Sequence, residues 1–160
     1  MKRTLGIFFF ILFIQRNSSG QEIPFEQLAL NYFAENILEQ QNYDDFKLYL
    51  NPITLGVDFR FHEFPNCFDD YMKNIELSNL SFSEINVPLK IEPSWNIKIR
   101  NKTKISKRKR YIETSRYFSM FRNKIVVIVS VYEPWQCDKY FVEFDEKGNY
   151  IRHCRGGYII

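Results

Sequence analysis

With 160 residues the chain is long enough for one domain that buries a core without help from a metal or a disulfide. Its formal net charge is +3, but three of its 22 basic residues lie within residues 1–20, which contain no acidic residue. The rest of the chain has 19 basic and 19 acidic residues. This balance argues against a protein that is attracted as a whole to nucleic acid or anionic membranes.

Residues 1–20 have the three-part pattern of a secretory signal peptide. A basic start is followed by residues 5–14, which include nothing polar, and then by a polar stretch that ends at Gly20. The apolar run is too short to cross a bilayer, which needs roughly 20 residues. We therefore expect export to the periplasm or cell exterior, with residues 21–160 as a single domain and no transmembrane segment after cleavage. An uncleaved anchor or a buried N-terminal helix are the alternatives.

Residues 24–41 predict an amphipathic helix, because apolar side chains recur there every three or four positions. The expected buried face consists of Phe25, Leu28, Ala29, Tyr32, Phe33 and Ile37. The glutamates, Glu26 among them, fall mainly elsewhere. Residues 46–50 and 53–61 then alternate between apolar and polar as strands do, and residues 68–75 suggest a short helix.

The C-terminal third predicts antiparallel strands. Residues 111–120 and 124–132 are the first two, and the second should be central in the sheet because it is almost entirely β-branched. Residues 139–144 and 150–154 form the next pair, joined by a tight turn in which Gly148 supplies the left-handed residue.

Together these elements predict an α+β fold, in which the N-terminal amphipathic helix packs on an antiparallel sheet with a C-terminal β-meander. The pair Gly156-Gly157 should interrupt the last strand. The layout also fits a cone-shaped, nuclear-transport-factor-like domain with a small pocket between helix and sheet. That comparison is an analogy of fold and carries no function.

Residues 140–154 read Tyr-Phe-Val-Glu-Phe-Asp-Glu-Lys-Gly-Asn-Tyr-Ile-Arg-His-Cys. The segment resembles the end of small secreted proteins of Bacteroidota, which commonly finish with a hairpin of the pattern Y-x-x-E-F-D-x-x-G-x-V-x-x-C after a signal peptide. Those proteins are largely uncharacterised. The resemblance therefore implies a compartment and a style of fold but no activity.

The chain has three cysteines, Cys67, Cys137 and Cys154, and in an exported protein a disulfide is the default. Pairing across the expected turn places Cys154 opposite Lys139 and one diagonal step from Cys137. We therefore favour a Cys137–Cys154 disulfide. A bond from Cys67 to either of the other two is the alternative.

No stretch of the sequence has a catalytic or cofactor motif at diagnostic spacing. His153 and Cys154 are neighbours on an expected strand, so their side chains point to opposite faces and cannot form a dyad. His62 stands at what resembles the start of a zinc-protease helix, but Asn66 occupies the position of the second histidine. We assign no catalytic residue, cofactor or metal, and we expect Glu143 to be solvated.

Charge is strongly segregated along the chain. Residues 21–86 have a net charge of −9, residues 87–110 one of +8 and the last fifty residues one of +1. No aromatic residue interleaves the densest basic stretch, although a tryptophan just precedes it. The candidate binding patch consists of Lys98, Arg100, Lys102, Lys104, Lys107, Arg108, Lys109, Arg110 and Trp95. Its alternatives are a solvated loop and a segment that neutralises the acidic N-terminal half.

The first hypothesis is a non-enzymatic binding or interaction protein of the periplasm or cell exterior, whose partner is an anionic polymer or an envelope component. Nucleic acid is disfavoured as that partner. The second is a small hydrolase or isomerase that uses His62 and a carboxylate in an aromatic pocket. The third is a structural envelope protein with no small-molecule ligand.

Overall fold

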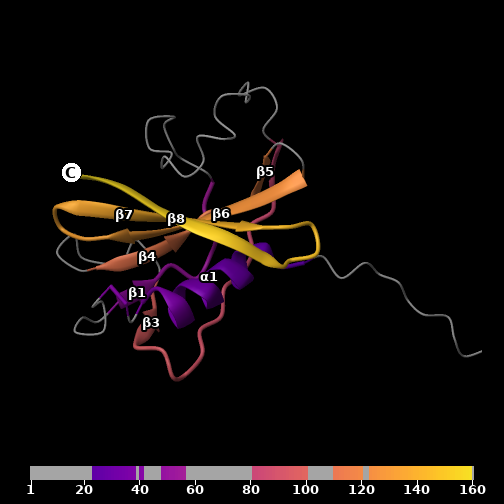
Figure 1. Cartoon of the computed structure of the whole chain (residues 1–160). Helices are drawn as coiled ribbons and strands as arrows, with labels where there is room; N and C mark the ends of the chain where they lie inside the picture. The colour runs from indigo at the N-terminus through magenta and orange to yellow at the C-terminus, as the bar shows by residue number, and fades with distance from the viewer. Residues whose placement is uncertain are drawn as a thin grey trace, which may run out of the picture.

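The computed structural model describes residues 23–38, 40–41, 48–56, 81–100, 110–120 and 123–159, and every statement about structure below refers to these residues (Figure 1). The expected signal peptide, most of the expected strand at residues 53–61 and the expected short helix at residues 68–75 lie outside them.

One helix and one eight-stranded mixed sheet make up the described fold, which confirms the α+β class. The helix is α1 (Phe25–Asn36). The strands are β1 (Leu48–Leu50), β2 (Ser81–Phe82), β3 (Ile97–Ile99), β4 (Tyr111–Thr114), β5 (Phe118–Met120), β6 (Lys124–Tyr132), β7 (Gln136–Phe144) and β8 (Tyr150–Ile159). The structure describes no helix that is long and apolar enough to cross a membrane.

Strand β6 is the centre of the sheet, as its β-branched sequence predicts. It pairs antiparallel with β4 and β5 along one side and with β7 along the other, and β8 follows β7. The expected strand at residues 111–120 is divided into β4 and β5, because residues 116–117 leave the ladder with β6, whereas the N–H of Ser115 still donates to the Ile128 carbonyl at 2.8 Å. Ser115 there bridges Leu55, and the backbone N–H of Arg116 donates to the Leu55 carbonyl at 2.7 Å.

The expectation of a purely antiparallel sheet is wrong. Strand β1 runs parallel to both of its neighbours, β3 and β4. Parallel neighbours need long crossover connections. The chain supplies them, because residues 51–96 separate β1 from β3 and residues 51–110 separate β1 from β4. Alternation of apolar and polar residues marks a strand but not the direction of its neighbour, so the pattern could not reveal this pairing.

The last strand is also longer than expected, because β8 continues through Gly156 and Gly157. At Gly157 the strand passes so close to β7 that a Cβ atom would come within 2.5 Å of the Cys137 carbonyl oxygen. The second glycine therefore permits a close backbone approach instead of ending the strand.

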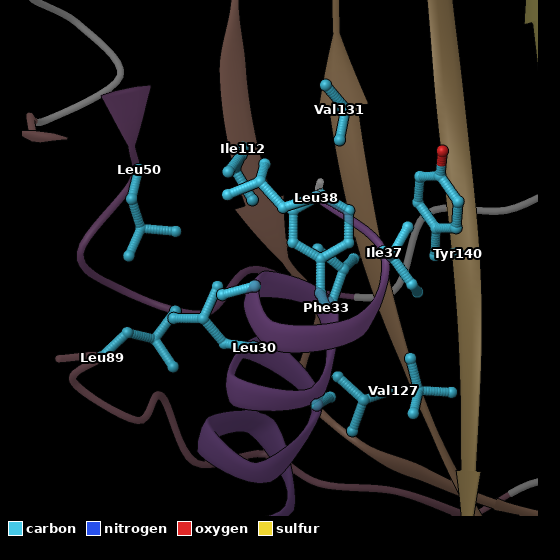
Figure 2. Packing of buried hydrophobic residues seen from close by; sticks show 14 of the residues in the cluster. Leu30, Phe33, Ile37, Leu38, Leu50, Leu89, Ile112, Val127, Val131 and Tyr140 are labelled. Atoms are coloured by element: carbon cyan, nitrogen blue, oxygen red, sulfur yellow. The ribbon is translucent and has the colours of Figure 1, made fainter. Parts of the chain in front are cut away.

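Helix α1 covers one face of the sheet, which we call the inner face; the other is the outer face. The helix lies below the sheet in Figure 1, and Figure 2 shows its side chains among those of the strands. Phe33 of the helix, for example, meets Tyr140 of β7 with ring centroids 5.3 Å apart. The most deeply buried members of this core include Ala29, Leu30, Phe33, Leu48, Leu50, Ile112, Val127, Val129, Val131, Tyr140 and Val142.

The helix differs from its prediction in two ways. It ends at Asn36 instead of residue 41, and Leu28 and Tyr32 are only partly buried. Glu26, by contrast, is 1% exposed although the sequence placed it off the buried face. Its Oε1 accepts a hydrogen bond of 3.0 Å from the backbone N–H of Tyr117. This bond offsets the cost of burying the polar group and joins α1 to the β4–β5 connection.

Candidate binding site at one end of the sheet

The sheet brings the two ends of the basic stretch together. Lys98 lies on β3, Arg100 follows it, and Arg110 immediately precedes β4, while β1 lies between these two strands. The N–H of Arg100 donates to the Leu50 carbonyl at 2.9 Å, and the N–H of Tyr49 donates to the Arg110 carbonyl at 3.2 Å. The basic stretch therefore leaves the sheet and re-enters it beside the same short strand. Its members Lys102, Lys104, Lys107, Arg108 and Lys109 lie outside the described residues.

A row of tyrosines crosses the outer face at this end. Tyr49 lies opposite both Lys98 and Tyr111, and Tyr111 lies opposite Tyr132. The rings of Tyr111 and Tyr132 are stacked, with centroids 4.7 Å apart and an interplanar angle of 10°. The guanidinium of Arg100 lies 5.0 Å from the centroid of the Tyr49 ring, within the range of a cation–π contact. No aromatic interleaves the basic stretch along the chain, but strand pairing places three beside it; we call Tyr49, Tyr111 and Tyr132 the tyrosine row.

The charges at this end differ in their exposure. Lys98 and Arg100 are exposed, whereas Arg110 is half-buried and its Nη2 lies 3.0 Å from Oε2 of Glu133. Glu133 belongs to the turn between β6 and β7. This acidic partner comes from the C-terminal third of the chain.

The two tryptophans differ in their exposure. Trp95, a member of the candidate binding patch, is partly buried and packs against the core. Trp135 is 77% exposed at the tip of the β6–β7 turn, which the N–H of Glu133 closes by donating to the Gln136 carbonyl at 2.8 Å. Its place in the sequence, after Pro134 and between two strand patterns, was the signal that sequence reasoning missed. The turn lies at the same end of the sheet as β1 and β3 (left in Figure 1).

A small polar pocket adjoins the tyrosine row on the outer face. Its floor is the next row of the sheet, where Glu113, Ser130 and Lys139 lie side by side on β4, β6 and β7. Glu113 and Lys139 are 6% and 4% exposed. The cavity volume is about 140 Å³ and Tyr132 lines it too, so it is smaller than ligand pockets of roughly 300–1,000 Å³. The pocket can accept hydrogen bonds or hold a small polar group. Through Tyr132 it borders the tyrosine row, beside which Lys98 lies.

The favoured Cys137–Cys154 disulfide is wrong. Cys137 is a buried thiol in no disulfide, and its Sγ lies 4.0 Å from the Asp138 carbonyl oxygen. The register explains the error: Cys154 lies opposite Phe141, not opposite Lys139. Four residues of β7 therefore separate the two cysteines, roughly 13 Å at 3.3 Å per residue, which is beyond the reach of a disulfide. Cys67 lies outside the described residues.

The remaining candidates fall on both faces. His153 is on the inner face, where it contacts α1, and Cys154 is on the outer face, as the alternation predicts. Glu143 is on the outer face but is fully buried, with its Oε2 2.7 Å from Nε of Arg152, so the expectation that it is solvated is wrong. His62 lies outside the described residues.

In the parts of the chain that the structure describes, no group of three or more His, Cys, Asp or Glu side chains is placed to hold a metal ion. Comparison with known proteins finds no matching family model, no matching curated protein and no matching solved structure.

Proposed function

We propose that this protein is a non-enzymatic binding module of the periplasm or cell exterior that holds an acidic polysaccharide at the tyrosine-row end of its sheet. The supporting observation is the parallel pairing of β1 with both β3 and β4, which gathers the ends of the basic stretch beside the tyrosine row. Exposed cations attract a polyanion over distances comparable to the Debye length. The exposed indole of Trp135 offers a flat apolar surface for a sugar ring.

The proposal includes export of the protein and its resemblance to secreted Bacteroidota proteins. Both concern the compartment in which the protein would encounter such a polymer. The nuclear-transport-factor-like cone stays a prediction from the sequence, and binding at the end of the sheet does not depend on it. The alternative of a pocket enzyme that uses His62 also stays a prediction.

The test compares two variants with the same change of charge. The double variant K98Q/R100Q removes two exposed cations beside the tyrosine row, and K90Q/K147Q removes two exposed lysines elsewhere. Binding to heparin, a sulfated uronate polysaccharide, is measured as the dissociation constant against salt concentration, with neutral dextran as the reference. We expect K98Q/R100Q to weaken binding roughly tenfold at low salt. We also expect a shallower slope of log affinity against log salt concentration, by the amount that corresponds to about two lost ionic contacts.

K90Q/K147Q should bind heparin as the unchanged protein does. The proposal is wrong if the unchanged protein does not bind heparin more tightly than dextran, or if both double variants lose affinity equally. Tighter binding to single-stranded DNA than to heparin would also overturn it, because the partner would then be a nucleic acid.

A further inference from the structure

A β-bulge on β8 turns the side chains of Tyr150 and His153 toward Tyr32 of helix α1. Arg152 lies opposite Glu143 and Tyr150 lies opposite Phe144, so Ile151 has no partner in the register. Residues three apart on a regular strand point to opposite faces. The extra residue places Tyr150 and His153 together on the inner face, and bulges commonly re-aim side chains in this way.

Helix α1 adds a third group to this pair. The hydroxyl of Tyr32 lies 3.1 Å from Nδ1 of His153, and the hydroxyl of Tyr150 lies 3.0 Å from the same nitrogen. The two tyrosine rings are stacked with centroids 4.0 Å apart and an interplanar angle of 16°. We call Tyr32, Tyr150 and His153 the Tyr–His–Tyr cluster.

The cluster gathers three atoms that can serve as metal ligands. The hydroxyl oxygens of Tyr32 and Tyr150 both lie within 3.1 Å of Nδ1 of His153. A metal ion bound among them takes the place of the hydroxyl protons that join these atoms without it. With metal–ligand bonds of about 2.0–2.1 Å, donors at right angles to each other are about 2.9 Å apart, close to the two distances observed.

We propose that the Tyr–His–Tyr cluster is a binding site for Fe(III), with the phenolate oxygens of Tyr32 and Tyr150 and Nδ1 of His153 as ligands. Phenolate is a hard anionic oxygen donor and imidazole suits iron, so this donor set favours a small, highly charged cation over a soft one. Tyr150 is 41% exposed and His153 is exposed too. The remaining coordination positions therefore face solvent, and water or a small chelating anion fills them.

Binding exchanges protons for the metal. Each tyrosine loses its phenolic proton to solvent as its oxygen bonds to Fe(III), so two protons are released and no electron is transferred.

The experiment titrates the full chain with Fe(III) nitrilotriacetate and records visible absorbance. We expect a phenolate-to-iron charge-transfer band that neither the protein nor the iron chelate shows alone. Y32F, Y150F and H153Q should each weaken binding by more than tenfold, because loss of an outer-shell partner alone costs roughly 10–100-fold in metal affinity. Y117F is the matched control, since it removes the hydroxyl of a tyrosine that packs on Phe25 of the same helix.

Circular dichroism of each variant shows whether its fold is retained, and replacing Tyr by Phe keeps the ring that packs. Absence of the band from the unchanged protein would overturn the proposal. So would a band of equal strength in folded Y32F and Y150F, or an equal loss in Y117F.

Discussion

The carboxylate of Glu143 is fully buried on the outer face of the sheet, directly across from Arg152 on the next strand. The pair is joined at 2.7 Å, and Arg152 is 30% exposed. Removal of one partner of a buried ion pair leaves a charge without its counter-charge, whereas replacement of both partners by apolar residues often costs little. The two kinds of change should therefore have very different effects.

We expect R152M to lower the free energy of unfolding by about 3–5 kcal/mol, and E143L/R152M to recover most of that loss. Urea unfolding at pH 7 measures both. The control is K90M, because Lys90 is exposed and surface substitutions usually change stability by less than about 0.5 kcal/mol. Equal losses in R152M and K90M would show that burial of Glu143 does not set the cost.

Single residues also show where sequence reasoning stops. Alternation along β7 places Glu143 correctly on the face opposite Val142, but it cannot say whether that face is covered. The helical period likewise puts Glu26 away from the core, yet the β4–β5 connection reaches it through Tyr117. In both cases a contact far away in the sequence decides the burial, and a local pattern holds no information about it.

At the scale of elements, the turn between β7 and β8 depends on Asp145. Its Oδ1 accepts hydrogen bonds from the N–H groups of Lys147 and Asn149, and its Oδ2 accepts one from the Asn149 side chain. The bond from the Asn149 side chain is the largest cause that lowers the pKa of Asp145 below 3.8. Folding therefore favours the ionised carboxyl. This contribution is present above pH 3.8 and is lost as the pH falls through the lowered pKa of the folded state.

We expect D145N to remove this acid dependence, because the amide keeps an acceptor oxygen but does not ionise. The measurement is the shift of the urea midpoint between pH 7 and pH 3, which should be smaller in D145N than in the unchanged protein. D145A should also lower the midpoint at pH 7, since it removes all three bonds. An identical acid shift in D145N and the unchanged protein would contradict this account of the turn.

The elements that the sequence predicts well are those with local causes. The turn between β7 and β8 needs an acid at its start and a glycine at Gly148, whose φ is 82°. Both residues can be recognised in the sequence. Strand β6 follows from its β-branched run. The parallel pairing of β1, the division of β4 from β5 and the bulge at Ile151 could not be predicted, because each is set by partners far along the chain. Both proposed sites depend on these features, so neither could be assembled from spacing alone.

At the scale of the whole molecule, the two ends of the sheet are separate. The tyrosine row and Trp135 lie where β6 turns into β7, whereas Tyr150 follows the β7–β8 turn at the opposite end of β7. Figure 1 shows these turns at the left and the right of the sheet. A polymer at one end therefore leaves the other accessible. Heparin binding and iron binding should accordingly be lost in different variants.

The state of the cysteines connects the sheet to the rest of the chain. Cys137 is buried between strands, so its thiol should resist reagents until the protein unfolds. Cys154 is then left with Cys67, the third cysteine in the sequence, as its partner within the chain. We therefore expect a Cys67–Cys154 disulfide in the exported protein, inferred by elimination because Cys67 lies outside the described residues.

Non-reducing peptide mapping should recover the Cys67 and Cys154 peptides as one species and the Cys137 peptide with a single thiol. The bond closes a loop of about ninety residues, which stabilises by roughly 4–5 kcal/mol in the chain-entropy model. C67S and C154S should then lower the urea midpoint by similar amounts, and the double variant should lose no more than either one. C137S is the control, because it removes a buried thiol without removing a bond. Recovery of a Cys137–Cys154 disulfide would contradict the register of β7 and β8, since that register holds the two strand cysteines four residues apart. Recovery of a Cys67–Cys137 disulfide would contradict the buried thiol at Cys137.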